Sequence, residues 1–185
     1  MKNTYITGYL PLIAILLYSM AFGIYAETEL IAFLKKFGLY NGILEFFSEQ
    51  EIRLTLFFLT SLVFFMLFSA LKLIADTIIQ LSMLFFSKDR QGLLLNETRF
   101  GSMFYVCSAL LSLLFVDYIT VIAGLFLITA LIYFIYFIYK TYSAFTFAGL
   151  VGMVFYHVIF WFMFASMVVY ACLKLYNSLL ESLPI

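Results

Sequence analysis

The sequence predicts an all-α, polytopic membrane protein with about five transmembrane helices and a few short amphipathic helices. Hydrophobic residues make up 66% of the 185 residues and charged residues only 11%, and the mean hydropathy is +1.12. Soluble domains carry roughly 25% charged residues. Several uncharged runs also reach the roughly 20 residues that a helix needs to cross a bilayer. We therefore expect a single integral membrane domain over residues 1–185.

The boundaries of the predicted elements follow from charges, glycines and polar clusters. The expected spans are about 5–26, 50–71 with a helical continuation to 87, 100–116, 118–139 and 144–173, with an outer loop at 27–49 and an inner loop at 88–99.

The first span is the charge-free run after Lys2. A cleaved signal peptide is the alternative, because Lys2 is a weak positive start and Ala21 and Gly23 resemble a cleavage site. The length of the run favours a retained membrane anchor.

The outer loop is rich in glutamate and changes the composition of the chain abruptly. Its apolar residues recur at helical spacing over Thr28–Phe37, which predicts a short amphipathic helix that ends at Gly38. A second short apolar piece follows at Ile43–Phe47. Ser48 and Glu51 then have the spacing of a capping box, so we expect the second spanning helix to start at Glu49.

That second helix is too long for a single perpendicular crossing. From Glu49 to Ser87 it would extend about 58 Å, against a hydrocarbon core of roughly 30 Å. We expect a change of direction or environment near Lys72. A six-span version, in which residues 73–87 insert separately, is the alternative.

The inner loop and the following hairpin are each marked by a polar residue. Asn96 is predicted to cap a helix; a glycosylation site at Asn96-Glu97-Thr98 is the alternative. The run 100–139 would extend about 60 Å as one helix. It must therefore fold back, and Asp117 is expected to mark the bend and cap the helix that starts at Tyr118.

The last span carries a ladder of small residues. Spacings of four residues on a membrane helix allow close approach of another helix. The expected helix-packing residues are Ala144, Ala148, Gly149 and Gly152.

Positive residues predict the topology, because cytoplasmic loops are enriched in lysine and arginine. With the N-terminus in the cytoplasm, the inner side carries Lys2, Lys72, Lys88, Arg90, Arg99 and Lys140, and the outer side carries Lys35, Lys36, Arg53 and Lys174. Five spans then put the C-terminus outside.

Lys72, Asp76 and Gln80 form a polar stripe on an otherwise apolar helix, because residues four apart share one helix face. One interpretation is an ion pair at the inner membrane surface, with the lysine reaching toward lipid headgroups. The other is a carboxylate on a proton or cation path. The first is favoured.

His157 is the one histidine of the chain and completes the candidate polar membrane site. It could relay protons, but a neutral histidine that bonds within or between helices is the simpler interpretation. The sequence has no metal-ligand spacing, and Cys107 and Cys172 are interpreted as small apolar residues. We find no phosphate-binding or hydrolase motif, so no cofactor or enzymatic activity is expected.

Two segments, MKNTYITGYLPLIAILLYS and FFMLFSALKLIADTIIQLSMLFFSKD, resemble the YufK family of small multi-pass membrane proteins from Bacillus and its relatives. The resemblance extends over the whole chain. It implies a location in the bacterial plasma membrane and no catalytic residue.

These observations predict a non-enzymatic structural or accessory component of the cell membrane. Its expected partners are the lipid bilayer and either a second copy or another membrane protein. The net charge of zero gives no reason to expect nucleic acid. The alternative is a small ion- or proton-coupled transporter, or a subunit of one, that uses the Lys72/Asp76 pair.

Overall fold

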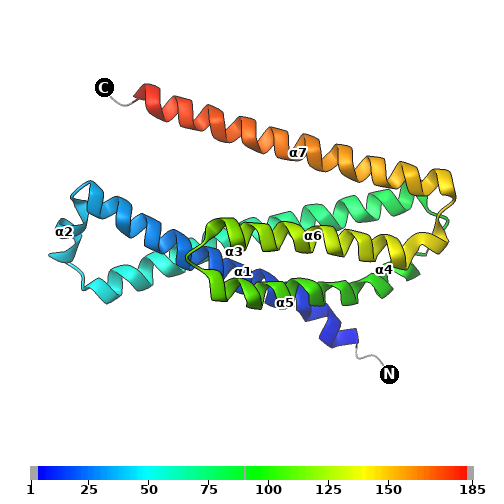
Figure 1. Cartoon of the computed structure of the whole chain (residues 1–185), viewed down its shortest axis with the longest axis horizontal. Helices are drawn as coiled ribbons and strands as arrows, with labels where there is room; N and C mark the ends of the chain where they lie inside the picture. Colours follow the sequence, from blue (N-terminus) through cyan, green and yellow to red (C-terminus); the bar gives the residue numbers. More distant parts are fainter. Residues whose placement is uncertain (1–3, 90, 183–185) are drawn as a thin grey trace. The chain divides into compact units, whose positions relative to one another are not determined.

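The described chain consists mainly of long apolar helices, and its all-α class is confirmed. The computed structural model describes residues 4–89 and 91–182. Within these ranges the elements are α1 (Thr4–Lys36), α2 (Leu39–Leu44), α3 (Glu49–Phe86), α4 (Leu93–Thr98), η1 (Arg99–Gly101), α5 (Ser102–Ser112), η2 (Leu113–Phe115), α6 (Ile119–Thr141), η3 (Tyr142–Ala144) and α7 (Phe147–Ser182) (Figure 1). Helices α1, α3, α6 and α7 are long and apolar enough to cross a membrane.

The fifth predicted span is shorter and is built differently. It runs from Arg99 to Phe115 and consists of α5 with a 3₁₀ turn at each end. Because a 3₁₀ helix rises about 2.0 Å per residue against 1.5 Å in an α-helix, the segment reaches about 28 Å. That length is close to the roughly 30 Å of a hydrocarbon core.

Helix α1 is longer than the sequence predicts. It continues without a break to Lys36, so the separate amphipathic helix over Thr28–Phe37 is wrong. The composition changes at Glu27, but no glycine or proline follows before Gly38. A change from apolar to charged residues changes the environment that a helix prefers, but it does not end the helix. Gly38 ends the run, and its φ of 71° is the left-handed conformation that glycine adopts at helix ends.

The start of α3 is confirmed at Glu49, and its cap has the predicted form. The Ser48 backbone N–H donates to Glu51 Oε2 at 2.8 Å, and the Glu51 N–H donates to Ser48 Oγ at 3.3 Å. The short helix before it, α2, lies at Leu39–Leu44 rather than over Ile43–Phe47, whose end forms a turn.

Helix α3 is one uninterrupted helix to Phe86. An unbroken helix cannot reverse its direction, so a separate return crossing by residues 73–87 is not compatible with this backbone. Of the two changes expected near Lys72, a change of helix direction is therefore not seen, and a change in the surroundings of the helix remains the prediction.

Three predicted boundaries differ from the structure. Asn96 lies inside α4 rather than before a helix, so its predicted cap is wrong. Tyr118 and not Asp117 directly precedes α6, a shift of one residue that is within the usual spread of helix ends. The last helix begins at Phe147 and continues to Ser182, beyond the expected 144–173, because Lys174 does not end it.

The described chain divides into two compact units. The first comprises residues up to Asp76 together with Leu93–Thr141, and the second comprises Thr77–Gly92 together with the residues from Tyr142 onward. The boundary falls within α3.

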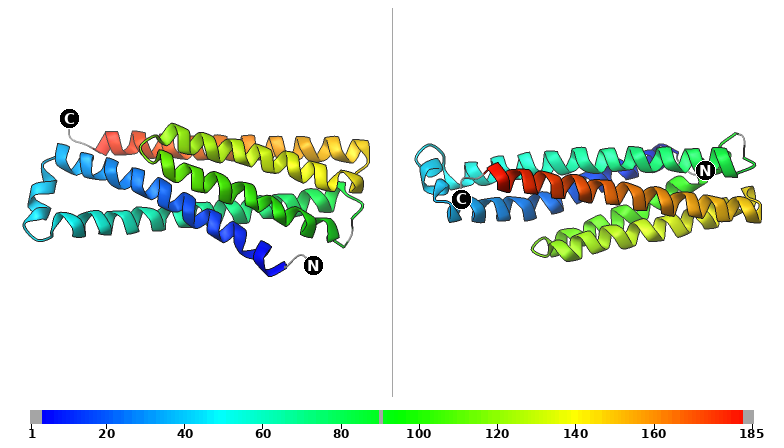
Figure 2. Two further views of the ribbon diagram at one scale, coloured as in Figure 1. Left: turned by 60° about the horizontal axis from the view of Figure 1, so that its bottom comes forward. Right: turned by 90° about the horizontal axis from the view of Figure 1, so that it is seen from above.

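The first unit is an antiparallel pair, α1 and α3, with α2 at its turn, and a hairpin of α5 and α6 (Figure 1). Helix α5 contacts both α1 and α6 (Figure 2). Its buried core contains Tyr18, Ala21, Phe68, Ala109 and Ile122. The Tyr18 ring meets Phe126 edge-on, with centroids 5.3 Å apart.

Tyr18 also carries a polar link across this core. Its hydroxyl lies 2.8 Å from Ser108 Oγ on α5. Since Ser108 Oγ donates to the Tyr105 carbonyl, Tyr18 is the donor. A buried hydroxyl in a membrane protein needs such a partner, because lipid offers none.

Helices α1 and α3 approach closely at Gly23. The Thr60 hydroxyl donates to the Gly23 carbonyl at 3.0 Å. A β-carbon at position 23 would lie 2.2 Å from Ser61 Oγ and 3.1 Å from Ser61 Cα. The absence of a side chain at Gly23 thus sets the spacing of the pair, as small residues do in membrane helix packing.

We expect Gly23→Ala to lower the thermal unfolding midpoint of the detergent-solubilised protein, with a loss of about 1–3 kcal/mol from overpacking. Gly124→Ala is the matched control, because nothing lies within 4 Å of a β-carbon there. Equal midpoints for the two variants would contradict this packing.

Candidate functional site

The candidate site begins with an ion pair on α3. Lys72 Nζ and Asp76 Oδ1 are in direct contact, one helical turn apart. Their side chains are 36% and 44% exposed, so both are partly open to the surroundings of the protein. A half-exposed pair of this kind keeps its charges accessible to lipid headgroups or water.

The side of the pair that faces the protein meets a tyrosine on another helix. Asp76 interacts electrostatically with Tyr133 of α6, and the Tyr133 side chain interacts with that of Thr98 on α4. Thr98 is buried, and its hydroxyl donates to the Leu95 carbonyl at 2.8 Å. Asp76 therefore interacts electrostatically with a small polar group between α4 and α6, although its side chain is the more exposed of the pair.

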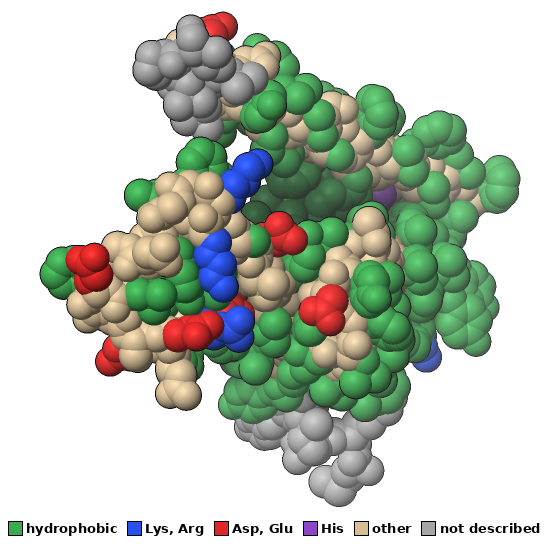
Figure 3. All heavy atoms as spheres, turned by 60° about the vertical axis from the view of Figure 1, so that its left-hand side comes forward, with side chains coloured by type: hydrophobic (Ala, Val, Ile, Leu, Met, Phe, Trp, Pro, Cys, Tyr) green, Lys and Arg blue, Asp and Glu red, His purple; other side chains and the backbone are tan. Residues whose placement is uncertain are grey.

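A second charged cluster lies toward the other end of the same helix. Arg53 Nε lies 3.9 Å from Glu27 Oε1 on α1 and 3.8 Å from Glu49 Oε1 on its own helix. The Glu27 side chain is only 12% exposed. Acidic and basic side chains gather over this α2 end of the helix pair (Figure 3).

The distance between the two clusters along α3 is close to the thickness of the hydrocarbon core of a bilayer. From Arg53 to Lys72, α3 extends about 28 Å at 1.5 Å per residue, close to the roughly 30 Å of the hydrocarbon core. A charge in the middle of a bilayer costs about 2.5–3.5 kcal/mol even on insertion scales. The stretch of α3 between them is long enough for Arg53 and the Lys72–Asp76 pair to lie at opposite surfaces of a membrane.

The two other candidate polar residues belong to the second unit. Gln80 is exposed on α3. His157 is 4% exposed on α7, and its Nδ1 lies 3.0 Å from the Met153 carbonyl of the same helix. Lys72 and Asp76 are thus brought together, whereas Gln80 and His157 lie in a different unit.

The predicted helix-packing residues serve contacts inside the second unit. A β-carbon at Gly149 would lie 2.6 Å from the Phe86 carbonyl oxygen, and one at Gly152 would lie 2.7 Å from the Phe86 ring. Ala144 is in η3 and not on α7, and its carbonyl accepts the Lys88 N–H at 2.8 Å. Ala148 is exposed.

The described residues contain no group of three or more His, Cys, Asp or Glu side chains placed to hold a metal ion. Cys107 and Cys172 are both free and exposed. The chemistry that the site offers is therefore charge pairing and hydrogen bonding.

Sequence reasoning missed Tyr133 and Thr98. Tyr133 lies in an apolar segment and Thr98 in a polar one, and neither stands out from its neighbours in the sequence. Their interaction becomes visible only in the contact between α4 and α6. The periodicity of α6 offered no signal that could separate Tyr133 from its other tyrosines.

Comparison with known proteins places the chain in a family. Residues 27–184 match the family of unknown function DUF5366. The chain belongs to this family. It is also 43% identical to the uncharacterized membrane protein YufK of Bacillus subtilis (strain 168), over all 185 residues and the full length of both proteins. The resemblance predicted from the sequence is confirmed. No solved structure gives a significant match to this DUF5366 chain.

In this DUF5366 protein, Gly149 and Gly152 should respond differently to the loss of the Phe86 ring. We expect Gly149→Ala and Gly152→Ala each to destabilise the second unit, measured as a lower unfolding midpoint in detergent. Phe86→Ala removes the ring but keeps the carbonyl, so it should rescue Gly152→Ala and leave Gly149→Ala impaired. Rescue of both variants, or of neither, would contradict the contacts.

Proposed function

We propose that this protein is a non-enzymatic structural or accessory component of the bacterial plasma membrane. The observation that carries the proposal is the spacing of its two charged clusters. Arg53 and Lys72 are separated on α3 by about one hydrocarbon core. Charges with this separation anchor a helix at both membrane surfaces and leave an aromatic, apolar core between them.

The proposed orientation has the N-terminus in the cytoplasm. It follows from the excess of lysine and arginine on the side of Lys72 and the inner loop. The glutamate-rich α2 end, with Glu27, Glu45 and Glu49, then faces outward. The similarity to a membrane protein of Bacillus subtilis supports a bacterial membrane location.

The proposed partners are the lipid bilayer and either a second copy of the chain or another membrane protein. Large apolar side chains on the second half of α7 are exposed and support this proposal. They include Phe162, Met163, Met167, Val169, Tyr170 and Leu173. Because Gly149 and Gly152 already contact Phe86, a partner would meet this part of α7 rather than the small-residue ladder.

A small ion- or proton-coupled transporter, or a subunit of one, is the second candidate. Its support is the interaction of Asp76 with Tyr133, because a carboxylate that contacts polar groups on another helix can form part of an ion path. Lys72 would hold this carboxylate on the path.

One set of variants separates the two proposals. We expect the purified protein in liposomes to give no pH-dependent ion flux, and Asp76→Asn and His157→Phe to leave its assembly with co-purified membrane proteins intact. Asp117→Asn, a substitution in the exposed turn before α6, is the matched control. Flux that the wild-type protein and Asp117→Asn retain but Asp76→Asn loses would overturn the accessory role in favour of transport.

A further inference from the structure

The turn that joins α1 to α3 through α2 has a small core of its own and an apolar patch outside that core. Ile31, Tyr40 and Ile52 form a buried cluster, and Lys35 Nζ lies 4.8 Å from the centroid of the Tyr40 ring. The turn is therefore packed, although several of its large apolar side chains are exposed. We call these exposed side chains the tip patch: Phe33, Phe37, Leu39, Leu44, Phe46 and Phe47.

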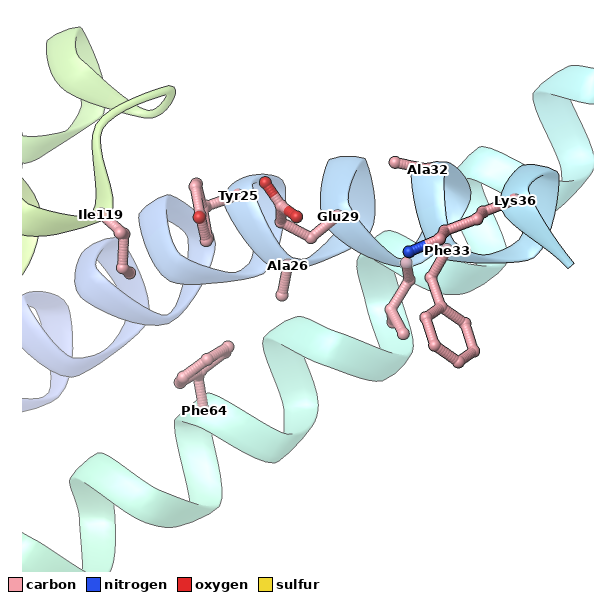
Figure 4. A pocket seen from close by; sticks show the side chains of 9 residues that line it. Tyr25, Ala26, Glu29, Ala32, Phe33, Lys36, Phe64 and Ile119 are labelled. Atoms are coloured by element: carbon pink, nitrogen blue, oxygen red, sulfur yellow. The ribbon is translucent and has the colours of Figure 1, made fainter. Parts of the chain in front are cut away.

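The tip patch lies beyond the part of the first unit that is proposed to cross the membrane. Along α1, Phe33 is about 9 Å and Lys36 about 13 Å beyond Glu27, at 1.5 Å per residue. Ile119, the first residue of α6, borders the same open groove as Tyr25, so the α5–α6 hairpin ends well short of the patch (Figure 4). With the ion pair of Glu27 at the membrane surface, the patch lies outside the interfacial layer, which is about 5–7 Å thick. Apolar side chains that stand in water in this way mark an interaction surface.

The two sides of the turn carry opposite charges next to their aromatic residues. On the α1 side, Lys36 and Phe33 line the groove together, and the Lys36 side chain extends back along this face of the helix (Figure 4). On the other side, Glu45 directly precedes Phe46, whose side chain is 81% exposed. Neither Lys36 nor Glu45 forms an ion pair with any described residue. Each side thus offers an aromatic residue and a charge that complement those of the other side.

We propose that the groove receives the same turn of a second copy of the chain. Phe46 of the second copy then packs against Phe33, and its Glu45 pairs with Lys36. Because both sides belong to one turn with a shared buried cluster, they lie at the same height above the membrane. Two copies in one membrane, related by a two-fold axis along the membrane normal, therefore make each contact twice.

This inference rests on the orientation proposed above and names a second copy as the partner. A lipid surface is a poor occupant, because the tip patch stands outside the interfacial layer. A shared membrane holds both copies at one height and in one orientation, which lowers the entropic cost of their association. A few exposed aromatic side chains on each copy then suffice, since aromatic residues supply much of the binding energy at interfaces.

The test counts subunits of the full-length protein in liposomes by single-molecule photobleaching, with one fluorophore at the N-terminus. We expect wild-type dimers. Lys36→Glu and Glu45→Lys should each weaken association about tenfold or more, because each places like charges together at both contacts. The double variant Lys36→Glu/Glu45→Lys exchanges the two charges and should restore the dimer. These side chains are exposed, so every variant should keep the wild-type unfolding midpoint in detergent.

Phe46→Ala should weaken association about tenfold, as the loss of a central aromatic residue does at other interfaces. Phe58→Ala is the matched control, because Phe58 is an exposed phenylalanine on α3 outside the turn. Wild-type monomers would overturn the proposal, and so would a wild-type dimer that survives both single charge reversals. A double variant that stays monomeric would contradict the pairing of Lys36 with Glu45. Wild-type monomers that give no ion flux would remove the dimer and leave the accessory role in place.

Discussion

The roughly 30 Å hydrocarbon core of a bilayer is the constraint against which the helix lengths of the first unit are compared. Along α3, Arg53 and Lys72 are about 28 Å apart, and from Asp117 to Lys140, along α6, the distance is about 34 Å. The short span from Arg99 to Phe115 approaches the same length because its ends are 3₁₀ turns, which rise more steeply per residue. No Asp, Glu, Lys or Arg lies between the ends of any of these three segments. Their ends do not all lie at one level, because Asp76 interacts with Tyr133, which is seven residues before Lys140.

The close contact at Gly23 extends this arrangement from one helix to two. With no side chain at Gly23, α1 lies against Ser61 and receives the Thr60 hydroxyl. The antiparallel register that results brings Glu27 next to Arg53 at one end. A largely buried glutamate would be costly without that partner. The close packing at Gly23 and the Glu27–Arg53 ion pair therefore depend on the same register between α1 and α3.

Local signals in the sequence predicted local structure well. The capping box of Ser48 and Glu51 and the stop at Gly38 are correct because each depends on a few neighbouring residues. The end of the first helix was missed because Glu27 changes the polarity of the chain without ending the helix. The partners of Gly23, Tyr133 and Gly152 lie on other helices, so no spacing along one helix could identify them. For the same reason the ion pair of Lys72 and Asp76 could be predicted from the sequence, whereas its neighbour Tyr133 on α6 could not.

The membrane position of the ion pair is tested by labelling single cysteines from each side of the membrane, in a background where Cys107 and Cys172 are replaced by alanine. The positions are Glu45→Cys, Met66→Cys and Asp76→Cys, and Met66 is 63% exposed in the middle of the proposed crossing. An impermeant maleimide should modify positions 45 and 76 from opposite sides and leave position 66 unmodified. If position 76 behaves like position 66, or is labelled from the same side as position 45, the pair does not lie at the second membrane surface.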